Sequence, residues 1–392
     1  MGRTSQQIFR SLVRVLIIHT EAQYFAGAER MLGYFLEGAL AQGIELSVAV
    51  VETDKMKTIL PEGISRIGLP SNQRFSMSAF CRQAAQVATW GREMKFDCVH
   101  GWAARDWELT SVCGLLLHCA ALGTLHDHPQ AGFISGHRQR LMRFLGRWGL
   151  RKVVCVSEAV QQACLEAGYP CSRLRVIRNG LPALTGGPQR GVKTAAPFRF
   201  GFLGVFSKRK GFDALFEIVR QFAEAQPSPK NWELWIAGAA QEPEGETILA
   251  RIREEYTTRA WWKQIRWVGW TERPLDFLNQ IDLLICPSRE FDPFPTVLLE
   301  AALMRAPALA SRVGGTPEIV VDGETGWLFD AERSDLAADR LGKLAADREA
   351  TRVAGQNAHR RVSEAFTIAR MAKEYLSAYQ EILPLRGGNE VT

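Results

Sequence analysis

The chain has 392 residues, enough for two domains, and its 46% hydrophobic and 23% charged residues are typical of a soluble globular protein. It lacks an apolar run long enough to cross a membrane, a signal-peptide core, and any Cys-x-x-Cys or zinc-ligand spacing among its eight cysteines, so we expect a cytoplasmic protein. Residues 1–190 contain 22 Lys and Arg against 14 Asp and Glu, and residues 191–392 contain 26 against 28. The basic first half favours an anionic partner, and because no zinc-finger, RNP-like or basic-zipper pattern is present, a membrane face is a better candidate than nucleic acid.

Short apolar runs alternate with longer amphipathic patterns along the whole chain, which indicates parallel sheets covered by helices. The expected strands of the first half are residues 14–20, 46–52, 98–102, 122–126, 153–157 and 174–178, and the first helix is 28–42. After a stretch rich in Gly and Pro, strands are expected at 199–204, 233–238, 265–270 and 282–287, and a last helix at about 362–383. This pattern predicts two doubly wound α/β domains, at 1–183 and 199–363, joined by a linker at 184–198 and followed by a helical segment at 364–392.

The segment 24–30, Tyr-Phe-Ala-Gly-Ala-Glu-Arg, leads into the first expected helix. Gly27 permits close backbone approach of a ligand at the helix N-terminus, where the helix dipole favours an anion. Glu29 has a simpler alternative role, which is to balance that dipole.

Two histidines end expected strands of the first domain. His126 follows Leu125 at the end of one strand, and His100 precedes Gly101 near the end of another. An imidazole in such a place can donate a hydrogen bond to a ligand hydroxyl or stabilise a developing charge. A capping or packing role is the alternative for either residue, and His100 is the weaker candidate.

The segment 134–152 mixes cations with large apolar residues. Arg140, Arg143 and Arg147 recur at helical spacing, and so do Leu141, Leu145 and Trp148. Such a helix can lie on anionic lipid. Alternatively, it packs its apolar side on the core and leaves a solvated basic face.

Segment 286–300, Cys-Pro-Ser-Arg-Glu-Phe-Asp-Pro-Phe-Pro-Thr-Val-Leu-Leu-Glu, is the most informative part of the chain. A turn with two carboxylates, Glu290 and Asp292, leads into a helix predicted to have Pro295 at its first position and Glu300 about one turn inside. Free backbone N–H groups at the helix start would favour an anion. These are the amides of Thr296, Val297 and Leu298. An anion pocket flanked by acids predicts a ligand that is phosphorylated and rich in hydroxyls, such as a sugar nucleotide.

The following segments, Val-Gly-Gly-Thr-Pro-Glu-Ile-Val at 313–320 and Asp-Gly-Glu-Thr-Gly-Trp-Leu-Phe at 322–329, complete a pattern that resembles retaining glycosyltransferase family 4 ("glycosyl transferases group 1"). The resemblance is nearly continuous over 201–329 and weaker over most of the remaining chain. It implies the GT-B fold, in which two Rossmann-like domains face each other across a cleft. The first domain would lie on the acceptor side and the second would bind the donor, while the terminal helix would cross back to the first domain.

The resemblance also implies roles for individual residues. The family motif of two Glu separated by seven residues corresponds to Asp292, one methylene shorter, and Glu300. Asp292 would hold hydroxyls of the donor sugar, a task that Glu290 could share. Glu300 would bind the ribose, and His126 takes the position of an active-site histidine. His100 would be a weaker candidate near the acceptor.

In segment 204–211, Gly-Val-Phe-Ser-Lys-Arg-Lys-Gly, the resemblance makes Lys210 a ligand of the donor diphosphate. Val205 stands where the family has Arg, so either Lys208 or Arg209 substitutes for it, or Lys210 and helix dipoles act alone. A solvated basic turn is the alternative. The base would lie near Trp270 and Thr271, although Trp270 could also be a packing residue of the core or sheet edge.

The implied activity is transfer of a sugar, with retention of configuration, from a UDP- or GDP-linked donor to a glycan or lipid-linked acceptor in bacterial polysaccharide or glycoconjugate synthesis. No cofactor or metal is expected, because the family is generally metal-independent and no strand-end Asp-x-Asp is present. Contact with the inner membrane face is a further expectation. A non-catalytic sugar-nucleotide-binding subunit remains an alternative, as does, less strongly, a sugar-nucleotide epimerase. An NAD enzyme is not expected, because no Gly-x-Gly-x-x-Gly follows the first strand.

Overall fold

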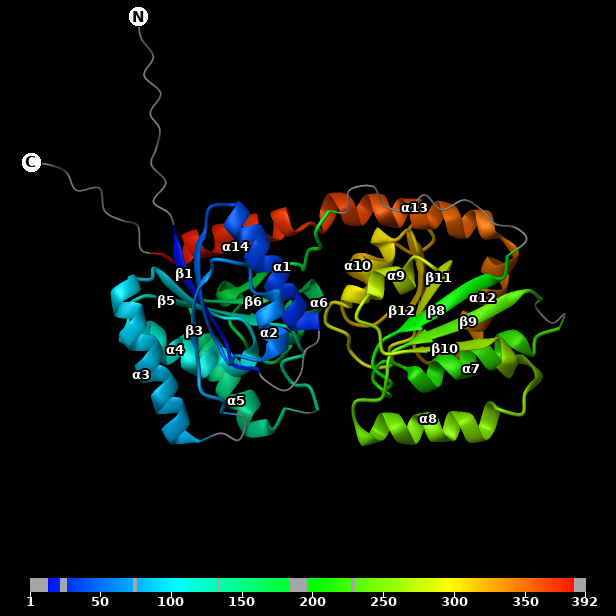
Figure 1. Cartoon of the computed structure of the whole chain (residues 1–392), viewed down its shortest axis with the longest axis horizontal. Coiled ribbons are helices and arrows are strands. Elements are labelled where there is room, and N and C mark those ends of the chain that lie inside the picture. Colours follow the sequence, from blue (N-terminus) through cyan, green and yellow to red (C-terminus); the bar gives the residue numbers. More distant parts are fainter. Residues whose placement is uncertain are drawn as a thin grey trace, which may run out of the picture. The chain divides into compact units, whose positions relative to one another are not determined.

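The computed structural model describes residues 13–21, 27–72, 76–132, 134–183, 196–226 and 230–383. The chain divides into two compact units (Figure 1). Unit 1 comprises Met1–Val156, Ala163–Gly180 and Ile368–Thr392, and unit 2 comprises Ser157–Gln162 and Leu181–Thr367. Most of the expected linker lies outside the described residues.

Unit 1 contains a seven-stranded parallel sheet in the order β3-β2-β1-β4-β5-β6-β7. Its strands are β1 Arg14–His19, β2 Glu45–Val50, β3 Ser65–Gly68, β4 Cys98–Gly101, β5 Ala120–Leu125, β6 Lys152–Cys155 and β7 Leu174–Val176. Its helices include α1 Gly27–Ala41, α2 Asp54–Ile59, α3 Met77–Met94, α4 Trp107–Leu116, α5 Gly136–Phe144 and α14 Ile368–Ile382, and α6 Glu158–Glu166 begins in unit 2. Shorter turns are η1 Ala104–Asp106, η2 Leu145–Gly149 and η3 Cys171–Arg173.

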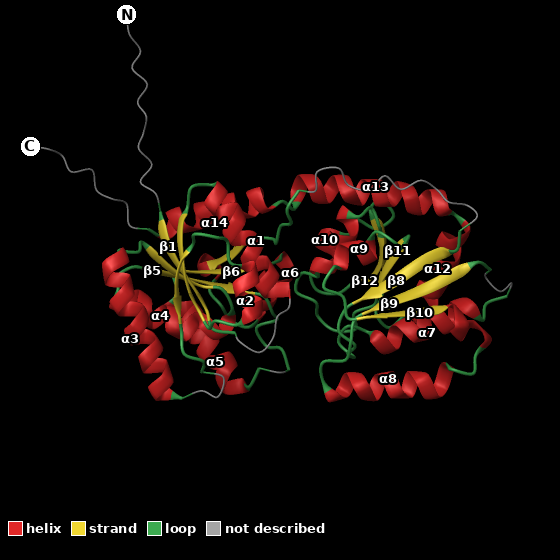
Figure 2. Cartoon of the chain, viewed as in Figure 1, coloured by secondary structure: helices red, strands yellow, loops and turns green. Residues whose placement is uncertain are grey.

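Unit 2 contains a six-stranded parallel sheet in the order β10-β9-β8-β11-β12-β13. Its strands are β8 Phe198–Leu203, β9 Trp232–Ala237, β10 Ile265–Gly269, β11 Leu283–Cys286, β12 Ala308–Ser311 and β13 Gly326–Phe329. Its helices are α7 Phe212–Ala223, α8 Pro243–Tyr256, α9 Pro274–Leu278, α10 Thr296–Leu303, α11 Thr316–Ile319, α12 Ser334–Ala346 and α13 Arg348–Ala365, with the short turn η4 Ala260–Gln264. Helices cover both faces of each sheet (Figure 2). The predicted α/β class with two doubly wound sheets is therefore confirmed.

Both strand orders change direction at one place, which is β1 next to β4 in unit 1 and β8 next to β11 in unit 2. In doubly wound sheets, ligands bind beyond the carboxyl ends of the strands at such a switch point. The segments that follow β1 and β4, and those that follow β8 and β11, are therefore the places to look for a site.

An aromatic core fixes one of these segments in unit 2. The rings of Phe206 and Phe212 stack with their centroids 4.0 Å apart, and Phe212 also meets Phe216 edge-on. All three side chains are buried. Because Phe206 lies inside segment 204–211 and Phe212 directly follows it, the stack holds this basic segment against the core.

The expected helix at 362–383 is wrong in one respect, because it is two helices. α13 ends at Ala365 and α14 begins at Ile368. The intervening Phe366 is buried, its carbonyl oxygen accepts the Leu181 N–H at 2.8 Å, and Thr367 forms a bridge with Leu181. Pairing with a distant segment thus replaces helical hydrogen bonds at the break, which local periodicity could not reveal.

α14 belongs to unit 1 and packs against α1. A Cβ atom at Gly38 of α1 would lie 2.8 Å from the Ile368 carbonyl oxygen, so glycine allows this close approach. Tyr375 and Tyr379 of α14 are fully buried in unit 1.

Candidate functional site

In unit 2, the segments that follow the adjacent strands β8 and β11 are held together through their backbones. Gly211 has a φ of +68°, and a Cβ atom there would lie 1.7 Å from the Pro287 carbonyl oxygen. The Arg209 carbonyl oxygen accepts the Arg289 N–H at 3.0 Å and the Glu290 N–H at 3.4 Å. These contacts give the two segments a fixed relative position at the switch point.

Lys210 and Asp292 meet across these two segments. The distance from Lys210 Nζ to Asp292 Oδ2 is 2.7 Å, and Ser288 Oγ donates to the same oxygen at 3.2 Å. Asp292 is 4% exposed, whereas the Lys210 side chain is 25% exposed. The sequence analysis proposed both residues for one ligand, and the structure brings them into direct contact.

The start of α10 differs from the expectation. Pro295 is the N-cap and not the first helical residue, because the helix begins at Thr296. The Leu298 N–H donates to the Pro295 carbonyl oxygen at 3.0 Å, so the prediction of a free amide there is wrong. This bond closes the first turn tightly, which leaves the amides of Thr296 and Val297 as the predicted anion contacts. Glu300 lies in α10 and is buried.

The other expected donor contacts lie at or near the same edge of the sheet. A Cβ at Gly238 would lie 1.9 Å from the Gly204 carbonyl oxygen, and the Gly238 N–H donates to Gly269 at 2.8 Å, so the ends of β8, β9 and β10 are drawn together. Trp270 follows β10 and is 53% exposed, so it is not a core residue. The remaining three residues range from partly buried to exposed: Val205, Thr271 and Glu290.

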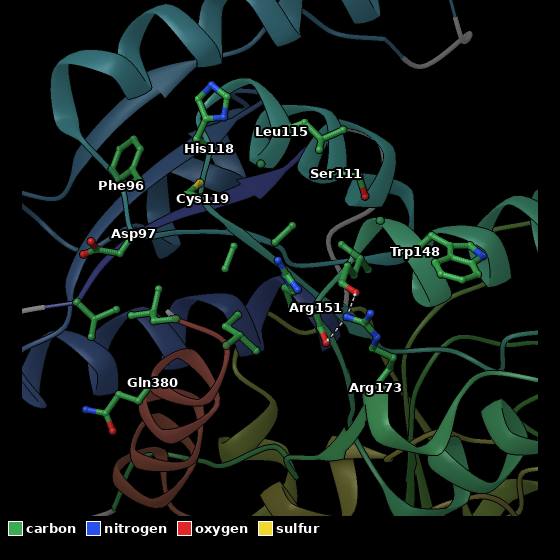
Figure 3. A pocket seen from close by; sticks show the side chains of 18 residues that line it. Phe96, Asp97, Ser111, Leu115, His118, Cys119, Trp148, Arg151, Arg173 and Gln380 are labelled. Carbon is green, nitrogen blue, oxygen red and sulfur yellow. Dashed lines mark hydrogen bonds between the residues drawn. The ribbon is translucent and has the colours of Figure 1, made fainter. Parts of the chain in front are cut away.

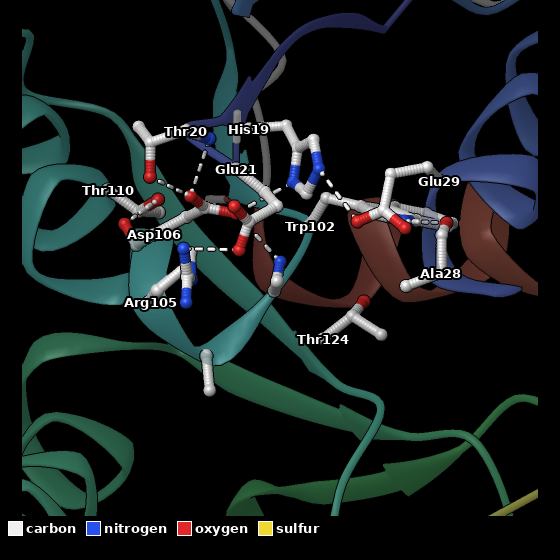
Figure 4. Close-up of polar contacts among 12 residues, drawn as sticks. His19, Thr20, Glu21, Ala28, Glu29, Trp102, Arg105, Asp106, Thr110 and Thr124 are labelled. Atoms are coloured by element: carbon white, nitrogen blue, oxygen red, sulfur yellow. Dashed lines mark hydrogen bonds and ion pairs between the residues drawn. The ribbon is translucent and has the colours of Figure 1, made fainter. Parts of the chain in front are cut away.

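Unit 1 has a buried polar cluster beyond the ends of β1 and β4 (Figure 4). His19 lies between two carboxylates, with Nδ1 3.3 Å from Asp106 Oδ2 and Nε2 3.3 Å from Glu29 Oε1. Asp106 also accepts the Thr20 N–H at 2.8 Å and its hydroxyl at 2.6 Å, as well as the Ala103 N–H at 2.9 Å. All three charged side chains are buried. His19 and Asp106 were not predicted from the sequence, although a histidine at the end of the apolar strand β1 was a signal.

The charges of this cluster stabilise one another. Burial lowers the pKa of His19, but hydrogen bonds and attraction from Asp106 and Glu29 outweigh it and raise the pKa to about 9. For Asp106, burial raises the pKa, but the bond to His19 and the Thr20 contacts lower it below its usual value. His19 is therefore an imidazolium at neutral pH, and it neutralises part of the buried negative charge.

His126 lies close to this cluster and has a different electrostatic character. Its ring is 5.2 Å from that of Trp102, and its buried Nε2 atom has no hydrogen-bond partner within the described residues. Burial lowers its pKa to about 4, and the nearby His19 charge lowers it as well. His126 is therefore a neutral imidazole with one nitrogen available to a ligand.

The expectation that His100 contacts an acceptor is contradicted. His100 is fully buried, and its two ring nitrogens lie 2.8 Å from the Tyr379 and Thr124 hydroxyl oxygens. Burial lowers its pKa to about 3. Its hydrogen-bonding capacity is used inside unit 1, because α14 covers β4 from a part of the chain almost 280 residues away.

Gly27 is the first residue of α1, and Glu29 lies in its first turn. Residues 24–26 of the expected loop lie outside the described residues. The contact with His19 gives Glu29 a specific partner, so balancing the helix dipole is not its only role. Ligand binding near Gly27 stays a prediction.

Comparisons with known proteins match both units. The model "Glycosyltransferase Family 4" covers residues 25–183, and "Glycosyl transferases group 1" covers residues 189–361. The chain belongs to glycosyltransferase family 4. Alpha-maltose-1-phosphate synthase of Mycolicibacterium smegmatis is 28% identical over 251 residues, which are 59% of this chain and only 63% of that protein. The lipopolysaccharide core biosynthesis glycosyltransferase LpsE of Rhizobium meliloti is 22% identical over 89% of this chain and 94% of its own length.

A solved structure of HepE from Anabaena, in complex with UDP-glucose, has a TM-score of 0.78 and 19% identity. The match covers 94% of this chain and 99% of HepE. At this level of identity the likeness shows the fold, and it confirms that this family 4 chain has the GT-B architecture of two Rossmann-like domains.

In this family 4 chain, the basic segment of unit 1 forms α5 and η2 and exposes both cations and large apolar side chains. Arg140, Arg143 and Arg147 are exposed. Phe144 is 58% exposed and Trp148 is 67% exposed. Leu141 is exposed too, whereas Leu145 is buried. The alternative of an amphipathic helix with all its apolar residues on the core is therefore wrong for Leu141 and Trp148.

A pocket of about 1030 Å³ opens beside this segment (Figure 3). Trp148, Leu115, Arg151 and Arg173 are among its lining residues. Asp97, which directly precedes β4, lines it as well, so the pocket lies at the amino ends of the strands. His19 and His126 lie at the other end of the sheet, where the strands have their carboxyl ends.

No helix among the described residues is long and apolar enough to span a bilayer. The part of the chain that the structure describes also has no group of three or more His, Cys, Asp or Glu residues arranged to hold a metal ion.

We predict that stability depends on His19 at alkaline pH. Because folding raises its pKa from 6.5 to about 9, its contribution is fully present below pH 6.5 and is lost as the pH rises through 9. The loss should be on the order of 3 kcal/mol. Urea unfolding of the wild type and His19→Gln at several pH values measures this. The buried cysteines also favour unfolding at alkaline pH, but both proteins share them, so parallel pH profiles would contradict the prediction.

We also predict that Gly211→Ala destabilises unit 2 more than Gly323→Ala does. Both glycines have positive φ, +68° and +79°, so each alanine carries the left-handed penalty of about 1–2 kcal/mol. Only at Gly211 would the new Cβ also overlap the Pro287 carbonyl oxygen, because Gly323 has no atom within 4 Å. Thermal unfolding of both variants gives the comparison, and equal losses would show that the backbone contact relaxes easily.

Proposed function

We propose that this chain is a retaining glycosyltransferase that moves a sugar from a nucleotide-sugar donor to a glycan or lipid-linked acceptor in the synthesis of bacterial cell-surface polysaccharides or glycoconjugates. The contact between Lys210 and Asp292, beyond adjacent strands of the unit matched by "Glycosyl transferases group 1", carries the proposal. A cation beside a carboxylate suits a ligand that combines phosphates with hydroxyls. The role of LpsE in lipopolysaccharide core biosynthesis and the UDP-glucose bound in the HepE complex support this substrate class.

The diphosphate of the donor would bind Lys210 and the amides of Thr296 and Val297 at the start of α10. Both groups favour negative charge, and they would stabilise the charge that develops on the leaving nucleoside diphosphate. We propose that these groups, and no metal ion, perform this task. Because Val205 offers no charge, Lys210 is the central cation of the proposed site. Glu300 would accept hydrogen bonds from the ribose hydroxyls.

Asp292 would bind hydroxyls of the donor sugar and would not attack its anomeric carbon. Double displacement would require a carboxylate nucleophile at that carbon. We propose instead a front-face reaction assisted by the leaving phosphate. His126 would supply a neutral imidazole whose Nε2 accepts a hydrogen bond from a sugar hydroxyl.

A non-catalytic sugar-nucleotide-binding subunit is the second candidate, and Val205 in the position of the family arginine favours it. Measured transfer separates the two, because a binder gives thermal shifts without turnover. Interconversion of the donor sugar in the absence of acceptor would indicate an epimerase instead.

We predict that a thermal-shift screen against UDP, GDP, ADP and their common sugar conjugates, with and without Mg²⁺, will show one metal-independent stabilisation. A ligand at a hundred times its dissociation constant stabilises a protein by about 2.7 kcal/mol. The nucleotide that produces the thermal shift identifies which nucleotide sugars to use as donors in transfer assays. A shift that requires Mg²⁺ contradicts the proposed role of Lys210, and the absence of any shift contradicts donor binding.

We predict that Asp292→Asn lowers turnover at least about a hundredfold while leaving the protein folded, because it weakens contacts to the sugar in the transition state. Asp276→Asn, in the more distant helix α9, is the matched control and should keep wild-type activity. Transfer assays on both variants, together with circular dichroism, decide the matter. Near wild-type turnover in Asp292→Asn would remove Asp292 from the reaction.

We further propose a peripheral contact between α5 with η2 and an anionic membrane. Exposed arginines would attract the lipid headgroups, while Phe144 and Trp148 would enter the interface. Flotation with phosphatidylglycerol vesicles should show binding that falls at high salt and with Trp148→Ser. Trp270→Ser is the control, because Trp270 is similarly exposed in unit 2. Absence of binding at low salt, or an equal loss in both variants, rejects this contact.

A further inference from the structure

The cation that should bind the diphosphate is already paired. Lys210 Nζ lies 2.7 Å from Asp292 Oδ2, and within the described residues no other cation forms an ion pair with Asp292. Arg289, in the same segment, pairs with Asp213 at 3.3 Å and lies 3.9 Å from Glu332. A diphosphate that recruits Lys210 therefore takes the cation away from Asp292.

Asp292 cannot follow Lys210. Its carbonyl oxygen accepts the Gly315 N–H at 2.9 Å, and a Cβ at Gly314 would lie 2.1 Å from the same oxygen. The Asp292 backbone is thus packed against that of the segment after β12, and Ser288 holds its carboxylate. Lys210 is the movable partner, because its charge sits on a flexible four-carbon chain and its side chain is 25% exposed.

Loss of Lys210 would leave a buried carboxylate with one remaining side-chain donor among the described residues, the Ser288 hydroxyl. Such a group is costly unless new hydrogen-bond donors replace the lost one. The hydroxyls of a donor sugar are donors of this kind. A nucleoside diphosphate without a sugar brings further negative charge and no such hydroxyl toward Asp292.

From this geometry we propose that Asp292 makes the site select a nucleotide sugar over the free nucleoside diphosphate: Asp292 competes with a diphosphate for Lys210, and only the sugar hydroxyls, by binding Asp292, offset the loss of that lysine. The inference rests on the proposed glycosyltransferase function. With a nucleotide sugar, Lys210 turns to the diphosphate and sugar hydroxyls take its place on Asp292. After transfer, the sugar has left, Asp292 recovers Lys210, and the product nucleoside diphosphate is weakened in its site.

The test measures dissociation constants by calorimetry for a nucleoside diphosphate and its sugar conjugate, using UDP with UDP-glucose and GDP with GDP-mannose. The wild type should bind one conjugate more tightly than its diphosphate. Asp292→Asn should tighten the diphosphate by about 5- to 150-fold, the usual range for coupled sites, and should reduce the preference for the conjugate. Asp339→Asn, whose exposed carboxylate pairs with Lys343 within α12, is the control and should retain the preference.

A double-mutant cycle tests whether the effect passes through Lys210. Lys210→Met should weaken both ligands by a similar factor, so their ratio should stay as in the wild type. In the Lys210→Met background, Asp292→Asn should no longer tighten the diphosphate. If it tightens the diphosphate equally there, simple repulsion explains the effect and the proposal is overturned.

Two other outcomes are decisive. If Asp292→Asn leaves diphosphate affinity unchanged or weaker, Asp292 is an ordinary sugar ligand and the exchange does not occur. If Asp292→Asn fails to fold, Lys210→Met still tests the proposal. The ratio of its dissociation constants for the diphosphate and the sugar conjugate should match that of the wild type, and loss of the sugar preference in Lys210→Met overturns the proposal. If the wild type binds neither pair of ligands, the proposed function itself fails, which is a different result from a changed ratio.

Discussion

The contact of Gly211 with the Pro287 carbonyl oxygen is the constraint on which the candidate donor site depends. It joins the segments after β8 and β11, and it requires a residue without a Cβ atom at a positive φ. The stacked rings of Phe206 and Phe212 hold one segment on the core, and the glycines at 314 and 315 hold the other. A flexible lysine and a fixed aspartate are thereby kept within hydrogen-bonding distance. The chemistry of the site follows from this backbone packing before any ligand is considered.

Unit 1 has a different arrangement of charges beyond the ends of β1 and β4, the two strands at its own switch point. His19 is buried between Asp106 and Glu29, and the attraction of two carboxylates keeps it charged. A few ångströms away, burial keeps His126 neutral. Two histidines in one region thus have opposite protonation states at neutral pH, because one has carboxylate partners and the other does not. The charged one organises the ends of β1 and η1, and the neutral one retains a nitrogen for a ligand.

The sequence predicted the sheets well because each buried strand is a short apolar run between polar segments. β3 and β13 were not expected: Ser65–Gly68 is short and largely exposed, and Gly326–Phe329 has only four residues. The donor-site residues Lys210 and Asp292 were found because they belong to motifs contiguous in sequence. His100 was misplaced for the opposite reason: Tyr379, which binds it, comes from a helix near the other end of the chain. The break between α13 and α14 and the engaged amide of Leu298 likewise depend on hydrogen bonds that periodicity does not encode.

The pairing of Lys210 with Asp292 matters more because the nearby Val205 carries no charge. With an arginine at that position, a diphosphate would have a second cation, and Lys210 would matter less to its affinity. With valine there, the proposed site would rely mainly on one lysine, and that lysine is shared with a buried carboxylate. A bidentate guanidinium binds phosphate more tightly than a lysine does, so valine at this position would lower the affinity of the proposed site for both the nucleoside diphosphate and its sugar conjugate. With less affinity from the phosphates, a larger share of the binding free energy of the donor would come from the sugar hydroxyls that contact Asp292.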